Sequence, residues 1–226
     1  MQKPKKKTLG KAEISRPVKP VRKPFNTLLW ALIIFLVAFA IYANSIPHGY
    51  ILDDSGVLKD NWVVKRGIDG IPLILKTPYR YGISLLTDDL YRPLSMVMFA
   101  IEWQLSPNTP AISHFVNVLF YALSCSLLLI VLRKLFRNYH PLLALFACLL
   151  WMAHPVHTEV VANIKSRDEI MSVFFLLLTI LGFLEFLNKG KPIYLIGAAF
   201  AYLLGFFSKE GIVTFLVIFQ IGRAHV

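Results

Sequence analysis

The sequence predicts an all-α, multi-pass membrane protein with a large loop on the far side of the membrane. Hydrophobic residues make up 56% of the 226 residues, which is more than a water-soluble domain of this size needs. They gather in runs that are long enough to cross the hydrocarbon core of a bilayer. Clusters of lysine and arginine follow every second run, as the positive-inside rule requires.

The first element is a basic arm over residues 1–24, which we expect to be disordered and cytoplasmic. It holds nine lysines and arginines against Glu13 alone, and so carries most of the formal net charge of +11. Its four prolines prevent a continuous helix. A nucleic-acid partner is not predicted, because the positive-inside rule explains a basic arm beside a membrane span.

A membrane domain with six spans is expected over residues 25–220. The first span lacks a small-residue cleavage site, so we expect a retained signal anchor rather than a signal peptide. The third span is short, so either its helix begins near Tyr139 or the polar residues after Ala153 lie at membrane depth. The expected spans are residues 26–43, 114–132, 139–153, 170–187, 192–207 and 211–220.

Basic residues set the expected orientation of these spans. Arg133, Lys134 and Arg137 follow the second span, and Lys189 and Lys191 follow the fourth. The positive-inside rule is satisfied when both groups lie in the cytoplasm together with the basic arm. The N-terminus is therefore expected in the cytoplasm, and the long loop after the first span lies on the far side.

The loop over residues 44–112 contains three short amphipathic stretches that are separated by glycine and proline. They are Val57–Val64, Ile71–Leu75 and Leu94–Leu105. We expect them to be interfacial helices that lie on the far membrane surface. A re-entrant segment at Leu94–Leu105 is an open alternative.

The last six residues, 221–226, resemble the translation of a sequencing-adapter read-through. We expect them to be an artefact, and the chain to be a truncated part of a longer gene product.

Polar and charged residues of unusual position gather on the far side only. A charge near the centre of a membrane costs about 2.5 to 3.5 kcal/mol on insertion scales, so such residues require an explanation. Asp53, Asp54 and Arg92 lie in the loop, His114 and Asn117 open the second span, and the others follow the third and fifth spans. These others are His154, His157, Glu159, Lys165, Arg167, Asp168, Lys209 and Glu210.

These residue types suit an enzyme that acts on a lipid phosphate. Such an enzyme needs a carboxylate that accepts the proton of an acceptor hydroxyl, and cations that stabilise a phosphate leaving group. Asp53 or Asp54 can be the base. The candidate cations are Arg92, Lys165, Arg167 and Lys209.

Each of these residues also has a structural interpretation. The two aspartates can cap a helix, and Arg92 can anchor the loop at the headgroups. The charges of residues 159–168 can pair with one another, as can Lys209 and Glu210.

No metal site is predicted, although a divalent cation bound with the substrate is an open alternative. Pro155 breaks the helical face that would align His154 and His157 as zinc ligands. Cys125 and Cys148 fall within apolar runs, where cysteine packs as a small hydrophobe, and they lack a metal-ligand spacing.

Five motifs follow one another in the order Asp53-Asp54, YRPL at 91–94, His114-x-x-Asn117, HPVHTEVVANIKSRDEI at 154–170 and SKEGI at 208–212. Together they resemble the membrane region of the transmembrane and tetratricopeptide-repeat-containing O-mannosyltransferases. The resemblance runs from about Asn44 to Thr214, and its most specific block is residues 154–168. Ser166 is a mild departure, because the family commonly has another small residue there, often glycine.

The resemblance implies a GT-C helical bundle and a transferase of a lipid-linked sugar. Such an enzyme moves a sugar, typically mannose, from a polyprenyl or dolichyl phosphate to an acceptor hydroxyl outside the cytoplasm. One of Asp53 and Asp54 would be the base, with inversion at the sugar carbon. Arg92 would bind the donor phosphate or substrate, and His114 and Asn117 would support the site. The other residues that would bind the donor phosphate or substrate are His154, His157, Glu159, Lys165, Arg167, Asp168, Lys209 and Glu210.

The expected partners are membrane lipid, the polyprenyl-phosphate sugar and an acceptor protein that is modified on serine or threonine. We expect a bacterial inner membrane with a periplasmic active face; an endoplasmic reticulum membrane with a lumenal active face is the alternative. The competing functions are a transporter or lipid flippase, and a non-catalytic membrane scaffold. A transporter places polar residues near the midplane of the membrane, whereas here they gather at one face.

Overall fold

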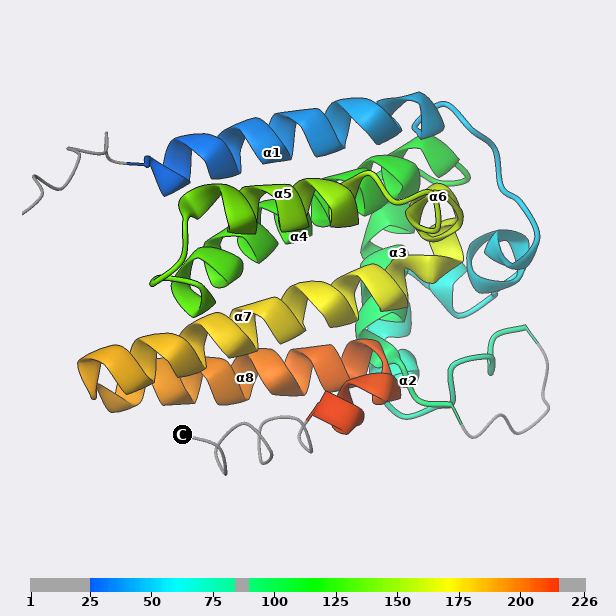
Figure 1. Ribbon diagram of the computed structural model, residues 1–226. Coiled ribbons are helices and arrows are strands. Elements are labelled where there is room, and N and C mark those ends of the chain that lie inside the picture. The colour runs from blue at the N-terminus through cyan, green and yellow to red at the C-terminus, as the bar shows by residue number, and fades with distance from the viewer. Residues whose placement is uncertain (1–24, 84–89, 216–226) are drawn as a thin grey trace, which may run out of the picture.

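The computed structural model describes residues 25–83 and 90–215 (Figure 1). The basic arm, residues 84–89, the second half of the last expected span (211–220) and the six final residues lie outside these ranges. The described part consists of helices and the loops that connect them, and has no strands. This confirms the all-α class that the sequence predicts.

Five apolar helices lie side by side and form a bundle (Figure 1). They are α1 (Thr27–Tyr42), α4 (Pro110–Leu135), α5 (Pro141–Met152), α7 (Arg167–Lys189) and α8 (Pro192–Ser208). By length and composition, α1, α4 and α7 can each cross a membrane, whereas α5 and α8 are shorter.

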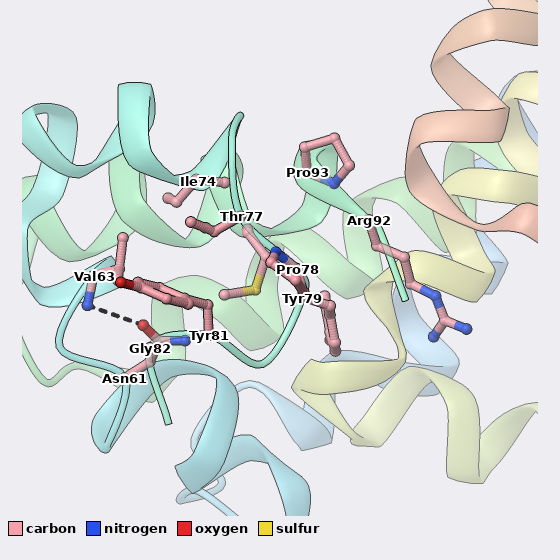
Figure 2. A pocket seen from close by; sticks show the side chains of 11 residues that line it. Asn61, Val63, Ile74, Thr77, Pro78, Tyr79, Tyr81, Gly82, Arg92 and Pro93 are labelled. Carbon is pink, nitrogen blue, oxygen red and sulfur yellow. Dashed lines mark hydrogen bonds between the residues drawn. The ribbon is translucent and has the colours of Figure 1, made fainter. Parts of the chain in front are cut away.

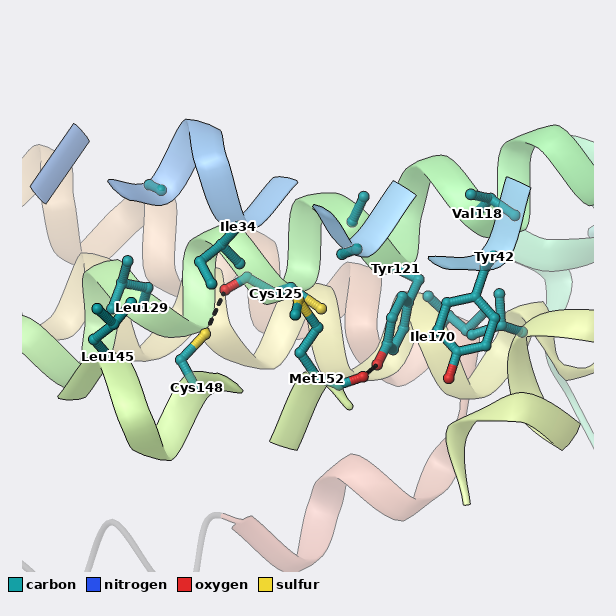
Figure 3. Close-up of a cluster of buried hydrophobic side chains, with 14 of the residues drawn as sticks. Ile34, Tyr42, Val118, Tyr121, Cys125, Leu129, Leu145, Cys148, Met152 and Ile170 are labelled. Atoms are coloured by element: carbon teal, nitrogen blue, oxygen red, sulfur yellow. Dashed lines mark hydrogen bonds between the residues drawn. The ribbon is translucent and has the colours of Figure 1, made fainter. Parts of the chain in front are cut away.

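Helices α1, α4 and α5 share the largest buried apolar cluster (Figure 3). Ile34 of α1 packs there against side chains of α4 and α5, and both cysteines are fully buried. The Cys148 thiol donates a hydrogen bond of 3.3 Å to the carbonyl of Cys125. On the opposite face of α1, Leu28, Leu32 and Leu36 are exposed, which is expected of side chains that contact lipid.

Helix α7 packs along α8 at close range. A Cβ atom on Gly182 of α7 would lie 3.0 Å from the Ala198 Cβ and 3.1 Å from the Tyr194 carbonyl of α8, so the approach depends on glycine. Gly190 ends α7 in a left-handed conformation (φ 66°), which closes the turn into α8.

The shorter helices gather at one end of the bundle, where α3 (Pro93–Leu105) runs across the ends of the longer helices (Figure 1). The others are η1 (Ala43–Ser45), η2 (Ser55–Lys59), η3 (Val64–Gly70), α2 (Ile71–Ile74), α6 (His157–Ala162), η4 (Ile164–Ser166) and η5 (Glu210–Val213). Residues from η2, η3, α2 and α3 bury a second apolar cluster around Phe99. The long loop therefore has a small core of its own.

The stretch Val57–Val64 is not one continuous helix. The Asn61 carboxamide oxygen accepts hydrogen bonds from the amides of Val63 and Val64, at 3.0 and 3.1 Å. In a continuous helix these two amides would donate to backbone carbonyls one turn earlier. Because the Asn61 side chain accepts them instead (Figure 2), η2 ends and η3 begins here.

The short third apolar segment begins at Pro141 and does not extend back to Tyr139. The His140 ring accepts a hydrogen bond from the Leu142 amide, which caps the helix. After Met152 the chain turns directly into α6, so residues 154–159 lie at the end of the bundle that carries α3 (Figure 1).

Candidate active site

The two aspartates after α1 have different surroundings. Asp54 is fully buried, and its carboxylate accepts hydrogen bonds from the Lys165 amide at 2.8 Å and the Ile51 amide at 3.2 Å. Burial raises the pKa of the Asp54 carboxyl above its usual range, against the lowering effect of the Lys165 amide. Asp53 is exposed. Asp54 therefore joins the loop to the connection before α7, and Asp53 is the carboxylate that is open to solvent.

Asp53 lines a cavity of about 230 Å³ together with Lys165. Leu52, directly before Asp53, has a left-handed backbone (φ 43°), which is unusual for a branched residue and often accompanies a functional site. The ammonium group of Lys165 has no ion-pair partner within the described ranges. The cavity is lined by Leu52, Asp53, Gly56, Val57, Tyr79, Arg80, Ile83 and Lys165.

Arg92, at the start of α3, binds two carboxylates from other helices. Its Nη1 donates to Asp168 Oδ2 at 2.7 Å, and its Nε donates to Glu210 Oε2 at 2.9 Å, while Nη2 binds the other Glu210 oxygen. Arg92 and Asp168 are buried, whereas the Glu210 side chain is 48% exposed. The hydrogen bond to Glu210 is the largest of the effects that raise the pKa of Arg92, and the same contact lowers the pKa of Glu210 to about 2.

Lys209 pairs with Glu169 at the first turn of α7. Glu210, the next residue along the chain, pairs with Arg92 at the start of α3. These two neighbouring residues after α8 therefore bind side chains of two different helices, α7 and α3. The charges of Arg92 and Lys209 are thus already balanced by carboxylates, which distinguishes both from Lys165.

Arg167 is fully buried and makes a network inside the helical end. Its Nε donates to Asn117 Oδ1 at 2.8 Å, its Nη2 donates to the Ser113 carbonyl at 2.7 Å, and its Nη1 pairs with Glu102. The guanidinium also lies 4.5 Å from the centre of the Phe99 ring. Arg167 therefore joins α3, α4 and α7, and is not open to a ligand.

Glu102 and Ser113 of this network are not among the residues that the sequence indicates. The Glu102 carboxylate also accepts a 2.5 Å hydrogen bond from the Ser113 hydroxyl. A signal was present, since Glu102 is the one acid in the apolar stretch Leu94–Leu105, and a lone acid on such a helix usually has a buried partner.

His114 and Asn117 lie one turn apart on α4 and hold backbone groups. The side-chain NH₂ group of Asn117 donates a hydrogen bond to the Asn163 carbonyl at 2.9 Å. The His114 Nε2 lies 3.2 Å from the Gly49 carbonyl. Both residues are fully buried and support the connections that carry Asp54 and Lys165.

The residues after α5 lie apart from the Arg92 group. The centres of the His157 and Trp151 rings are 4.4 Å apart. Burial of His157 lowers the pKa of its imidazole. The His154 Nδ1 accepts a hydrogen bond from the Val156 amide at 3.2 Å, and both His154 and Glu159 are exposed. In the part of the chain that the structure describes, no three His, Cys, Asp or Glu side chains are placed to hold a metal ion.

A family model for dolichyl-phosphate-mannose-protein mannosyltransferases matches residues 96–222. Protein O-mannosyl-transferase TMTC4 of Mus musculus is 30% identical over 191 residues, which are 77% of this chain and 25% of that protein. TMTC3 of Homo sapiens is 31% identical over 65% of this chain and 16% of its own length. Tmtc1 of Drosophila melanogaster is 30% identical over 80% of this chain and 21% of its own length. The chain thus spans a quarter or less of these relatives, and no solved structure matches it significantly.

Proposed function

Because this chain belongs to the dolichyl-phosphate-mannose-protein mannosyltransferase family, we propose that it transfers mannose from a lipid phosphate to an acceptor hydroxyl. The resemblance to the transmembrane and tetratricopeptide-repeat-containing O-mannosyltransferases, which the motifs indicate, is confirmed by the curated relatives. The apolar helices and the family together make the chain part of a multi-pass membrane protein.

The observation that carries the proposal is the cavity shared by Asp53 and Lys165. It combines an accessible carboxylate with an ammonium group that has no carboxylate partner within 4 Å among the described residues. A carboxylate can accept a proton from a hydroxyl, and an ammonium group can stabilise a phosphate. The same cavity can therefore supply both the base and the charge that stabilises the leaving phosphate in one displacement reaction.

In the proposed reaction the Asp53 carboxylate accepts the proton of the acceptor hydroxyl. The acceptor oxygen then forms a bond to the sugar anomeric carbon, while the bond between that carbon and the phosphate oxygen breaks. The electron pair of the broken bond stays on the phosphate, which leaves as a lipid phosphate. Lys165 stabilises this added negative charge, and direct attack inverts the configuration of the sugar carbon.

The remaining charged residues are assigned to the walls of the site. Asp54 fixes the backbone on both sides of the cavity, because its carboxylate accepts hydrogen bonds from the backbone amides of Ile51 and Lys165. Arg92 and Lys209 hold α3, α7 and the segment after α8 together through their carboxylate partners. We place the cavity on the extracytoplasmic face, either periplasmic or lumenal, with a protein serine or threonine as acceptor.

The test is a transfer assay on membranes from cells that express the complete gene, with radiolabelled polyprenyl-phosphate-mannose as donor. We expect Asp53→Asn to lower kcat by about 10²- to 10⁴-fold, because the base is lost. The matched control is Asp60→Asn, which neutralises an exposed carboxylate of the same loop. Lys165→Gln should weaken donor binding, and its control is Lys59→Gln, which neutralises an exposed cation of the long loop.

Protein level is followed by immunoblotting in every variant. Full activity of a well-expressed Asp53→Asn variant would exclude Asp53 as the base. Absence of transfer by the wild type, with several lipid-linked sugars and acceptor proteins, would refute the mannosyltransferase function itself.

A further inference from the structure

Helices α7 and α8 leave a groove between them that has room for a ligand. It measures about 430 Å³, which lies within the usual range for a small-molecule site, about 300 to 1,000 Å³. Gly182, Gly197 and Ala201 are small residues of its lining, and a Cβ atom on Gly197 would meet no atom within 4 Å. The rest of the lining is mostly apolar, and Phe200 is 62% exposed. The groove therefore suits a hydrocarbon chain that enters from the membrane.

One end of this groove is charged. Glu185 and Tyr194 line it near the turn from α7 to α8. Glu185 pairs with Lys134 of α4 and, at 2.7 Å, with Lys189, which also donates a hydrogen bond of 3.0 Å to the Tyr194 hydroxyl. The side chains of Lys134 and Lys189 are 39% and 44% exposed, whereas that of Glu185 is 15% exposed. An anion that approaches this end therefore meets the ammonium groups before the carboxylate.

Positive charge exceeds negative charge at this end of the bundle, which lies opposite α3 (Figure 1). Within the described ranges Glu185 is the one acid there, so it neutralises one cation and leaves a surplus. In the orientation that the basic residues predict, this end faces the cytoplasm, where the membrane leaflet contains anionic lipid. The charged end of the groove thus complements an anionic headgroup. The cations of this end are Arg133, Lys134, Arg137, Lys189 and Lys191.

The lipid-phosphate-sugar donor of the proposed reaction does not fit this charged end. Its phosphate is assigned to Lys165, which precedes α7, whereas Lys189 is the last residue of α7. At 1.5 Å per residue the helix is roughly 34 Å long, so a lipid with a single phosphate cannot serve both ends. This exclusion of the donor rests on the proposed function, but the charged groove itself does not.

We propose that the groove between α7 and α8 binds one phospholipid with an anionic headgroup. Its hydrocarbon chain lies along Gly182 and Gly197, and its phosphate accepts hydrogen bonds from Lys134 and Lys189. Because Lys134 belongs to α4, the bound lipid joins three helices at the end of the bundle that is opposite the candidate active site.

The binding experiment uses the full-length protein, purified in detergent and depleted of lipid, and counts bound lipid by native mass spectrometry. The probes are phosphatidylglycerol and phosphatidylcholine with the same acyl chains. We expect phosphatidylglycerol to bind at least about fivefold more tightly, since one unit of charge near a membrane surface changes affinity by about that factor. Equal binding of the two lipids would overturn the anionic headgroup. Displacement of phosphatidylglycerol by an equal concentration of polyprenyl-phosphate-mannose would assign the groove to the donor instead.

Two variants test the charged end in opposite directions. Glu185→Gln removes the acid that competes with the phosphate, so phosphatidylglycerol should bind about fivefold more tightly. The triple variant Lys134→Gln/Glu185→Gln/Lys189→Gln removes both cations without leaving a lone carboxylate, and it should bind the lipid about fivefold more weakly than the wild type. Changes of the same sign in both variants would contradict a phosphate at this end.

A third variant tests the groove itself. Gly197→Leu fills it with a side chain, because the Cβ position of Gly197 is open, and should abolish retention of phosphatidylglycerol. The matched control is Ala199→Leu in the second groove between these helices, where no charged residue of the described part contributes to the lining. This control should bind the lipid as the wild type does.

The melting temperature of Gly197→Leu in lipid-free detergent distinguishes a lipid from a protein occupant. It should not fall below that of the wild type, since no protein atom lies at the new Cβ position. A fall there, without a fall in Ala199→Leu, would mean that another segment of the complete protein fills the groove, and would overturn the lipid site. Unchanged binding of phosphatidylglycerol in every variant would place that lipid elsewhere on the protein.

Discussion

Arg92 and Asp168 lie 76 residues apart in the sequence, yet Arg92 Nη1 and Asp168 Oδ2 are 2.7 Å apart in the structure. Arg92 stands at the start of α3 and Asp168 in the first turn of α7, so the pair joins the loop helices to the membrane bundle. Both side chains are buried, whereas the second partner of Arg92, Glu210, is half exposed. The two carboxylates that bind the Arg92 guanidinium therefore contribute differently to the stability of the protein.

Arg92→Gln should destabilise the protein more than Asp168→Asn does. Loss of the arginine leaves the buried Asp168 carboxylate without its partner, which typically costs about 3 to 5 kcal/mol. Loss of Asp168 leaves Arg92 with Glu210, so the cost should be smaller. The measurement is the free energy of unfolding of purified protein in detergent micelles. Equal losses in both variants would contradict the unequal roles of the two carboxylates.

The Arg92–Glu210 contact should persist in acid. Because the pKa of Glu210 is lowered from 4.5 to about 2, the contribution of its ionised form is complete above pH 4.5. That contribution is lost as the pH falls through about 2. The difference in melting temperature between the wild type and Glu210→Gln should therefore be constant from pH 8 to 5 and shrink only below about pH 4. A difference that already vanishes at pH 5.5 would refute the contact in solution.

The sequence predicts the helical class and the gathering of polar residues at one end, because apolar runs and basic flanks are local signals. It does not distinguish Asp53 from Asp54, since their burial depends on where the Lys165 amide lies, more than a hundred positions later. For the same reason Arg167 could not be separated from Lys165. One side chain is enclosed by Glu102 and Asn117, and the other lines a cavity.

Asp54→Asn should lower protein stability, whereas Asp53→Asn should not. Both oxygens of Asp54 accept backbone amides, and an asparagine would place an NH₂ group against one of these donors. The expected cost is about 1 to 3 kcal/mol for an unsatisfied buried donor. Melting temperatures of the two variants test this difference. Equal melting temperatures would contradict a structural role for Asp54.

Arg167→Lys should be nearly as damaging as Arg167→Gln. The guanidinium of Arg167 serves Glu102, Asn117 and the Ser113 carbonyl at once, and a lysine ammonium cannot reproduce that planar geometry. Arg167→Gln is expected to cost about 3 to 5 kcal/mol, because the Glu102 carboxylate is left buried without its partner. Arg167→Lys should approach this cost, because an ammonium group that pairs with Glu102 leaves the buried Asn117 and Ser113 oxygens without their donors. The matched control is Arg137→Lys at an exposed site. Rescue of stability by lysine at position 167 would show that charge alone suffices there.

The orientation of the bundle can be tested by cysteine labelling without first removing the native thiols. Cys125 and Cys148 are fully buried, so a membrane-impermeant maleimide should not modify the wild type. Lys59→Cys and Asn138→Cys each place a thiol at an exposed position, at opposite ends of the bundle. In sealed vesicles whose extracytoplasmic face points outward, the thiol at position 59 should react and the thiol at position 138 should react only after permeabilisation. Because the Asp53–Lys165 cavity lies at the end that carries Lys59, the reverse pattern would place it in the cytoplasm and exclude transfer on the far side of the membrane.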